Sequence, residues 1–152
     1  MSNWKLNNFL ALLGLLLLLF LTFFRENFLL AINATISGVE YDRAYFYWFS
    51  DFFKNISIKD LALWKWGLTI FFSIIMSLIT LLSLYSWFQS KQLIKLTSLI
   101  YLGVFLFVVL LGGIGALLNN FDSVYIILRK ILGVVQTPIP FFIFFTLFYK
   151  IK

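Results

Sequence analysis

Apolar residues are concentrated in four long runs, which are separated by shorter polar segments. The runs cover about residues 7–28, 62–88, 96–118 and 126–148. An α-helix rises 1.5 Å per residue, so about 20 apolar residues are needed to cross a hydrocarbon core about 30 Å thick. The pattern predicts an all-α polytopic membrane protein with four transmembrane helices. No repeat or linker divides the chain, so we expect a single membrane domain over residues 1–152.

The first of these runs is the shortest. Its continuous apolar part, Phe9–Phe24, begins after Lys5 and ends at Arg25-Glu26. This part reaches only about 24 Å along a helix, so flanking residues must complete the span. A basic residue before an apolar run is also typical of a signal peptide, but no small-residue cleavage site follows it immediately. We therefore expect an uncleaved first helix.

The polar segment between the first two runs, about residues 29–60, contains a dense aromatic block from Tyr41 to Lys54. Gly38 predicts a break in front of this block. Aromatic residues interleaved with charges are typical of the head-group level of a bilayer. We expect an aromatic-rich extracytoplasmic loop or interfacial helix here. It forms either part of an aromatic belt or a docking surface for a partner protein.

Small and hydroxyl-bearing residues recur at helical spacing in the second and third runs. The second run carries Thr69, Ser73, Ser77, Thr80 and Ser83 at spacings of four, four, three and three. The third run carries Gly112 and Ala116 in a small-xxx-small pattern. Such residues let transmembrane helices approach closely, so both sets predict helix packing. The alternative for the hydroxyl stripe is a polar permeation path.

The fourth run is interrupted by Pro138 and Pro140 near its middle. A proline has no N–H and disturbs the preceding turn, so we expect a kink there. Gln136 is the most polar residue deep in any run, and we expect it to bond to backbone groups that the prolines leave free. Arg129 and Lys130 lie near the start of this run and are expected to extend toward the interface.

Composition agrees with the membrane class. Of the residues, 62% are hydrophobic and 12% are charged, whereas a soluble domain carries about 25% charged residues. The chain contains no cysteine and no histidine. This excludes disulfides, thiolate and imidazole metal ligands, histidine-ligated haem, and cysteine or histidine catalysis. We therefore predict no cofactor, no metal site and no catalytic residues.

The net charge of +6 comes from cations that flank the apolar runs. Such cations orient membrane helices and meet anionic lipid head groups, so we expect membrane lipid and no nucleic acid as a partner. With four spans, one side holds Lys5, Lys91, Lys95, Lys150 and Lys152 and no acidic residue. We predict a multi-pass protein of the bacterial inner (cytoplasmic) membrane with both termini cytoplasmic.

Several short motifs occur in a recognisable order. Arg25-Glu26 is followed by Tyr41-Asp42, by Phe49–Lys54 ending in Phe-Phe-Lys, and then by Tyr125, Arg129-Lys130 and Gln136-Thr-Pro138. This order resembles the small membrane proteins associated with exosortase F in Bacteroidetes. The chain departs from that pattern where Arg43 follows Asp42 in place of proline, and where Thr137 separates Gln136 from Pro138. The resemblance implies an assisting subunit of a sortase-like membrane enzyme. The enzyme itself uses Cys, Arg and His, and this chain has neither Cys nor His, so it cannot be that enzyme.

We therefore predict a non-catalytic accessory or scaffold subunit that binds another integral membrane protein. The expected contact residues are Tyr41, Asp42, Arg43, Trp48, Asp51, Phe52, Arg129, Lys130 and Gln136. Three alternatives stay open. They are a small transporter or channel subunit, an accessory subunit of a respiratory or secretion complex, and an outer-face membrane enzyme that uses Glu40, Asp42, Arg43 and Asp51.

Overall fold

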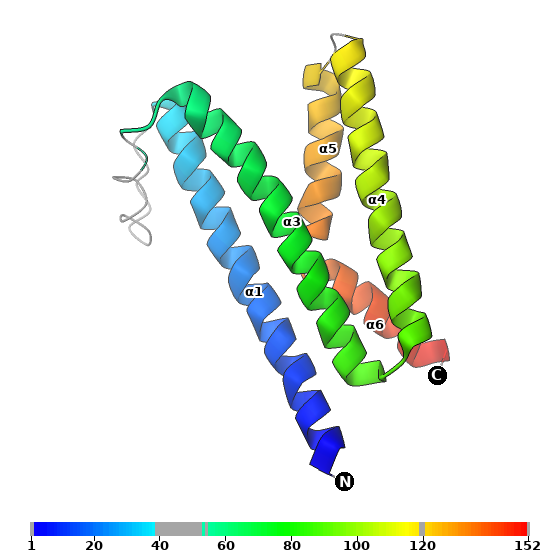
Figure 1. Cartoon of the computed structure of the whole chain (residues 1–152). Coiled ribbons are helices and arrows are strands. Elements are labelled where there is room, and N and C mark those ends of the chain that lie inside the picture. Colours follow the sequence, from blue (N-terminus) through cyan, green and yellow to red (C-terminus); the bar gives the residue numbers. More distant parts are fainter. Residues whose placement is uncertain (1, 39–52, 54, 119–120, 152) are drawn as a thin grey trace.

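The computed structural model describes residues 2–38, 53, 55–118 and 121–151. The helices in this part are α1 (Ser2–Ser37), α3 (Ile58–Phe88), α4 (Lys91–Leu117), α5 (Phe121–Val135) and α6 (Ile139–Ile151) (Figure 1). The described residues contain no strand, so the all-α class is confirmed. The aromatic block between Tyr41 and Phe52, with the loop or interfacial helix expected there, lies outside the described residues.

Within the described residues, three helices, α1, α3 and α4, are long and apolar enough to cross a membrane, and a fourth crossing exists if α5 and α6 form one bent span. The angle between α5 and α6 is 57°. The structure is thus consistent with a membrane protein of three or four spans. In Figure 1 the amino terminus of α1 and the carboxyl terminus of α6 lie toward the same end of the molecule, where α3 turns into α4.

Helix α1 continues past residue 28, where the sequence pattern places the start of the polar segment. Its last turns are held by Thr35, whose Oγ1 donates to Ala31 O at 3.0 Å, and by Ser37, whose Oγ donates to Asn33 O at 2.9 Å. Buried Ala31 and Ile32 pack with Phe53 and Leu61 in a small apolar cluster. This burial extends the helix through polar residues. The helix ends before Gly38, whose φ of 66° suits a glycine.

The fourth run forms two helices rather than one kinked helix. Pro138 cannot donate to Val134 O, and Thr137 replaces it, with its N at 3.2 Å and its Oγ1 at 2.7 Å from that oxygen. Thr137 Oγ1 also accepts from Ile139 N at 3.3 Å. The prolines therefore separate α5 from α6, and Thr137 compensates part of the lost helical bonding.

The helices pack as two antiparallel pairs joined by a common core. Helix α1 packs on α3, and α4 packs on α5 and α3. Figure 1 shows α1 and α3 side by side along most of their length, with α6 crossing obliquely between α3 and α4. The core is rich in aromatic side chains from α3, α4 and α6. Its buried members are Leu18, Met76, Leu84, Phe88, Tyr101, Val135, Phe141, Phe144 and Phe148.

Helix α1 lies directly against α3 at Gly14. A Cβ atom built at Gly14 would overlap Ser83 Oγ and lie 3.1 Å from Ser83 Cβ. The Ser83 hydroxyl is buried and donates to Ile79 O at 2.7 Å. A glycine facing a serine thus lets the two backbones pack tightly, as small residues do in membrane helix pairs.

Candidate functional site

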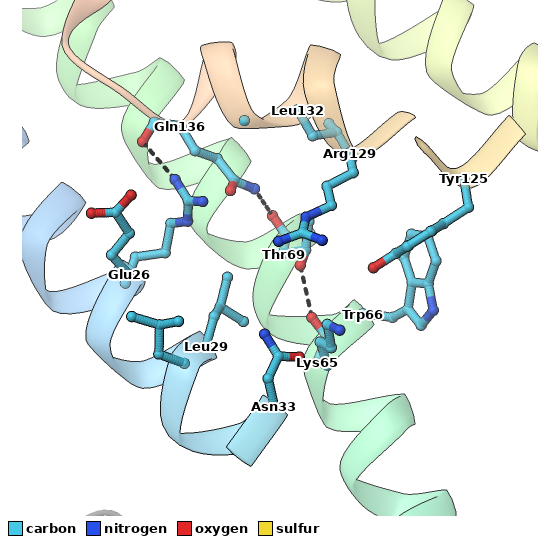
Figure 2. A pocket seen from close by; sticks show the side chains of 13 residues that line it. Glu26, Leu29, Asn33, Lys65, Trp66, Thr69, Tyr125, Arg129, Leu132 and Gln136 are labelled. Carbon is cyan, nitrogen blue, oxygen red and sulfur yellow. Dashed lines mark hydrogen bonds between the residues drawn. The ribbon is translucent and has the colours of Figure 1, made fainter. Parts of the chain in front are cut away.

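A cavity of about 200 Å³ lies between α1, α3 and α5, next to the break before α6. Its lining includes Arg25 from α1, Lys65 from α3 and Arg129 from α5, together with the carboxylate of Glu26. Figure 2 shows side chains from all three helices around this space. The cavity gathers charged residues that are up to about a hundred positions apart in the sequence.

Gln136 closes the inner end of the cavity. Its side chain is buried, and its Nε2 donates to Thr69 O at 2.6 Å and to Ser73 Oγ at 2.5 Å on α3. Ser73 Oγ in turn donates to Thr69 O at 2.7 Å. The expectation that Gln136 bonds to backbone freed by the prolines is wrong, since the side chain instead fixes the end of α5 to the middle of α3.

The carbonyl of Gln136 is the group that a proline leaves free. In a continuous helix this oxygen would accept from the N–H of residue 140, but residue 140 is a proline. Arg25 replaces that donor, with Nη1 at 3.2 Å from Gln136 O (Figure 2). The guanidinium of α1 therefore caps α5 at its broken end.

Arg25 is only partly satisfied by this bond. A guanidinium carries five N–H donors. Among the residues that the structure describes, Nε of Arg25 is buried and has no acceptor. The Arg25 side chain forms a single hydrogen bond with the described residues, which is the bond to Gln136 O. Unused donors of a half-buried cation are therefore available beside the cavity.

The other end of the cavity is aromatic. Trp66 and Tyr125 meet edge to face, with ring centroids 5.4 Å apart. Thr69 Oγ1 donates to Lys65 O at 2.8 Å, which keeps that hydroxyl on its own helix. In Figure 2 the Arg129 side chain extends from α5 toward Thr69 on α3. Trp and Tyr are enriched at membrane interfaces, so this end is the one expected nearer to the head groups.

The chemistry of the cavity is that of a cationic binding site. Three cations and one carboxylate line it, and Asn33 adds an amide. No group of three or more His, Cys, Asp or Glu side chains in the described part of the chain could hold a metal ion. Positive charge and free donors in a confined space favour an anionic ligand.

Two of the three described residues predicted for partner contact line this cavity. They are Arg129 and Gln136, whereas Lys130, which is exposed as Arg129 is, is not part of the lining. The remaining six, Tyr41, Asp42, Arg43, Trp48, Asp51 and Phe52, lie outside the described residues, as does Glu40. Of the aromatic block, Phe53 alone is described.

The hydroxyl stripe faces the interior of the helix bundle. Ser73, Ser77, Thr80 and Ser83 are buried, and Thr69 is half-buried at the cavity. The hydroxyls of Ser73, Ser77 and Ser83 donate to carbonyls one turn earlier in α3. These residues therefore lie at helix contacts and form their hydrogen bonds mainly within α3.

The small residues of α4 lie where this helix meets α5. A Cβ built at Gly112 would be 3.7 Å from Leu128 Cδ1, and one at Gly115 would be 3.0 Å from Val124 Cβ. The side chain of Ala116 lies outside the described part of the structure. Gly115 thus makes a closer contact than Gly112 does, although both glycines belong to the same sequence cluster.

The opposite face of α4 is exposed and has a regular composition. It carries leucine and glycine at alternating spacings of four and three, in the order Leu99, Gly103, Leu106, Leu110, Gly113 and Leu117. No atom lies within 4 Å of a Cβ built at Gly103 or Gly113. We refer to these six residues as the outer face of α4.

Sequence reasoning missed Arg25 and Lys65 as parts of one site. Arg25 was interpreted as the end of the first span, because the helix was not expected to continue to Ser37. A charged residue followed by twelve further helix-compatible positions, seven of them apolar, was the available signal. The outer face of α4 was detectable from spacing alone, since its leucines and glycines follow a heptad pattern.

Comparisons with protein-family models, with curated proteins and with solved structures find no match to this chain. The class of the protein follows from its own helices. It is an all-helical protein with three or four segments able to cross a membrane and a cationic cavity at the break in the last of them.

Proposed function

We propose that the protein is a non-catalytic accessory subunit of an inner-membrane complex, in which a transmembrane helix of another integral membrane protein packs on the outer face of α4. The observation that carries this proposal is the exposed Leu/Gly pattern of that face. It is combined with a topology of four spans, in which α5 and α6 form one bent span and both termini are cytoplasmic.

The spacing of these residues favours a helix over lipid as the occupant of this face. Acyl chains adapt to any apolar surface and need no particular spacing. Alternating spacings of four and three keep residues on one side of a helix that crosses a second helix at about 20°. Glycines at two of the six positions allow the backbones to approach, while the leucines fill the spaces between side chains of the partner. The occupant that fits best is therefore another helix.

The resemblance to exosortase F-associated proteins supports a sortase-like membrane enzyme as the partner. In this arrangement the aromatic block supplies a second contact outside the membrane through Tyr41, Asp42, Arg43, Trp48, Asp51 and Phe52. Both contacts fit a membrane-spanning partner that also has an extracytoplasmic part.

The test is co-purification in mild detergent after co-expression with the sortase-like membrane enzyme of the same genome. Gly103→Leu and Gly113→Leu place bulk on the outer face of α4 and are expected to reduce recovery of the enzyme about tenfold, which corresponds to about 1.4 kcal/mol. Gly67→Leu is the matched control, because Gly67 is also an exposed helical glycine with no atom near its added Cβ.

Equal recovery with all three variants would contradict the proposed face. A chain that purifies alone from these membranes would contradict the accessory role. Photocrosslinking from Leu106 or Leu110 that yields only dimers of this chain would assign the face to a homo-oligomer instead.

A further inference from the structure

The cavity between α1, α3 and α5 extends into the depth expected for the hydrocarbon core. Trp66 and Trp87 are 21 residues apart on α3, about 31 Å along a helix, which matches the thickness of a bilayer core. Thr69 and Ser73, which hold Gln136, lie about 5 and 10 Å further in than Trp66. The guanidinium that bonds Gln136 O is therefore well below the interface.

A cation at this depth requires compensation. Charged side chains inside membranes are unfavourable unless they are paired or lie in a polar cavity, and they commonly mark functional sites. Among the described residues, Arg25 has one carbonyl as acceptor and a buried Nε without any. Glu26 is exposed at the edge of the cavity. Among the described lining residues it is the only carboxylate, whereas Lys65 and Arg129 add two further cations to Arg25. The three cations of the lining therefore exceed its one carboxylate by two charges.

The cavity is reached from the outside of the bundle. Glu26 and Leu30 both line it, and both are exposed on α1, one turn apart. Helices α1 and α5 each pack on α3, with the cavity between them. A group that enters between α1 and α5 would meet Arg25, Lys65 and Arg129 in the cavity.

We propose that this cavity binds a phosphate group, with Arg25, Lys65 and Arg129 as its cationic donors. The donors come from three helices that surround the space, so they match the four oxygens of a tetrahedral group better than the two oxygens of a planar carboxylate. A cavity of about 200 Å³ accommodates such a group with its ester oxygen. The source is either a lipid head group, with acyl chains in the bilayer beyond Leu30, or free phosphate.

Native mass spectrometry of the purified protein tests this inference. The probes are dioleoyl phosphatidic acid and dioleoylglycerol, which differ only by the phosphate group. Phosphatidic acid is expected to be retained at least about tenfold better than dioleoylglycerol by the wild-type chain. Arg129→Met and Arg25→Met are expected to lower this retention about tenfold, and Arg25→Lys by a smaller factor, since lysine keeps the charge but loses the fork.

Lys130→Met is the matched control. Lys130 is the neighbouring cation on α5, is exposed, and does not line the cavity. The Lys130→Met variant is expected to retain phosphatidic acid within about twofold of the wild-type chain, because the substitution leaves the cavity intact. Arg129 takes part in no hydrogen bond among the described residues, so Arg129→Met keeps the test valid if Arg25→Met fails to fold.

A competition arm with millimolar inorganic phosphate separates the two sources. Displacement of phosphatidic acid by phosphate, together with binding of phosphate in the absence of lipid, would assign the site to the free ion. Retention of the lipid in excess phosphate would assign it to a head group. Equal retention of both lipids with no phosphate binding, or equal loss from Arg129→Met and Lys130→Met, would overturn the inference.

Discussion

Pro140 determines the hydrogen bonds of two residues distant from each other in the sequence. Because it lacks an N–H, Gln136 O has no donor in its own helix, and Arg25 of α1 becomes that donor. The side chain of Gln136 is then free to bond to α3. A kink and a freed carbonyl at this position follow from the sequence. The identity of the donor depends on how α1 packs, and local sequence does not specify it.

At the residue scale we predict that Gln136→Leu destabilises the protein by about 1 kcal/mol, since polar contacts between membrane helices contribute about that much. The effect is modest because Thr69 O and Ser73 Oγ keep their bonds within α3. Unfolding in a denaturing detergent measures it. A double-mutant cycle with Ser73→Ala is expected to show coupling, because both changes remove the same bond.

Gln92→Leu provides the control for this measurement, since Gln92 is an exposed amide in the first turn of α4. Its stability is expected to stay within about 0.5 kcal/mol of the wild-type value. A Gln136→Leu protein as stable as this control would show that the bonds to α3 contribute nothing measurable.

At the scale of elements, the packing of α1 on α3 depends on Gly14. We predict that Gly14→Ala destabilises the protein by about 1–3 kcal/mol, because the added methyl overlaps Ser83 Oγ. In a Ser83→Ala background the same change is expected to be less unfavourable, since the hydroxyl is gone and only Ser83 Cβ stays close. Thermal unfolding in detergent checks the four proteins of this cycle.

Gly67→Ala is the reference for the intrinsic effect of the substitution. No atom lies within 4 Å of an added Cβ at Gly67, and alanine favours helix by about 1 kcal/mol over glycine. We expect this variant to be at least as stable as the wild-type chain. A Gly14→Ala protein as stable as the Gly67→Ala protein would contradict the close approach of α1 and α3 at Gly14.

The angle between α5 and α6 is the second feature that belongs to this scale. We predict that the double change Pro138→Ala, Pro140→Ala straightens the pair, because it restores the two missing N–H groups. Spin labels at exposed Ile127 and Leu147 report the result. Over 20 residues a straight helix spans about 30 Å, whereas the 57° bend shortens this to about 26 Å between backbone positions.

A label pair within α4, at exposed Ile100 and Val109, should keep its distance in the same variant. An unchanged distance between Ile127 and Leu147 would assign the bend to tertiary packing. Phe141, Phe144 and Phe148 of α6 are buried in the core and could hold the helix in place without the prolines.

The elements were predictable to different degrees. Continuous apolar runs are sufficient to locate α3 and α4, because length and hydrophobicity alone define such helices. The end of α1 could not be predicted from the sequence, since Asn33, Thr35 and Ser37 are polar. The helix continues there because of local side-chain hydrogen bonds and because Ile32 packs in the cluster with Phe53. Tertiary contacts decide such boundaries.

The cavity was even less accessible to sequence reasoning. Gln136 and Arg129 attract attention because they are polar near a broken helix. Arg25 and Lys65 do not, since a cation at the apparent end of an apolar run is usually a flank that meets head groups. Only the packing of both α1 and α5 on α3 brings all of these residues around one cavity.

At the scale of the whole molecule, the number of crossings depends on whether α5 and α6 traverse the bilayer together or turn back within it. Their apolar composition allows either arrangement. Both ends of the chain lie toward the α3–α4 turn in Figure 1, which favours a complete fourth crossing. The buried aromatic side chains of α6 pack against α3 and α4 near that turn, as a crossing helix would.

Cysteine labelling distinguishes the two arrangements without background, because the chain contains no cysteine. Single substitutions at exposed Asn55, Gln92 and Lys150 sample the α1–α3 connection, the α3–α4 turn and the end of α6. With a membrane-impermeant maleimide added to intact bacterial cells, we predict that Asn55→Cys is labelled and that Gln92→Cys and Lys150→Cys are protected until the cells are opened. A re-entrant pair would instead return the chain to the outer side, so Lys150→Cys would react together with Asn55→Cys. Labelling of Gln92→Cys but not of Asn55→Cys would reverse the orientation of the first three spans. It would also place the cationic cavity near the cytoplasmic surface, where phosphate-bearing lipids and free phosphate are both available.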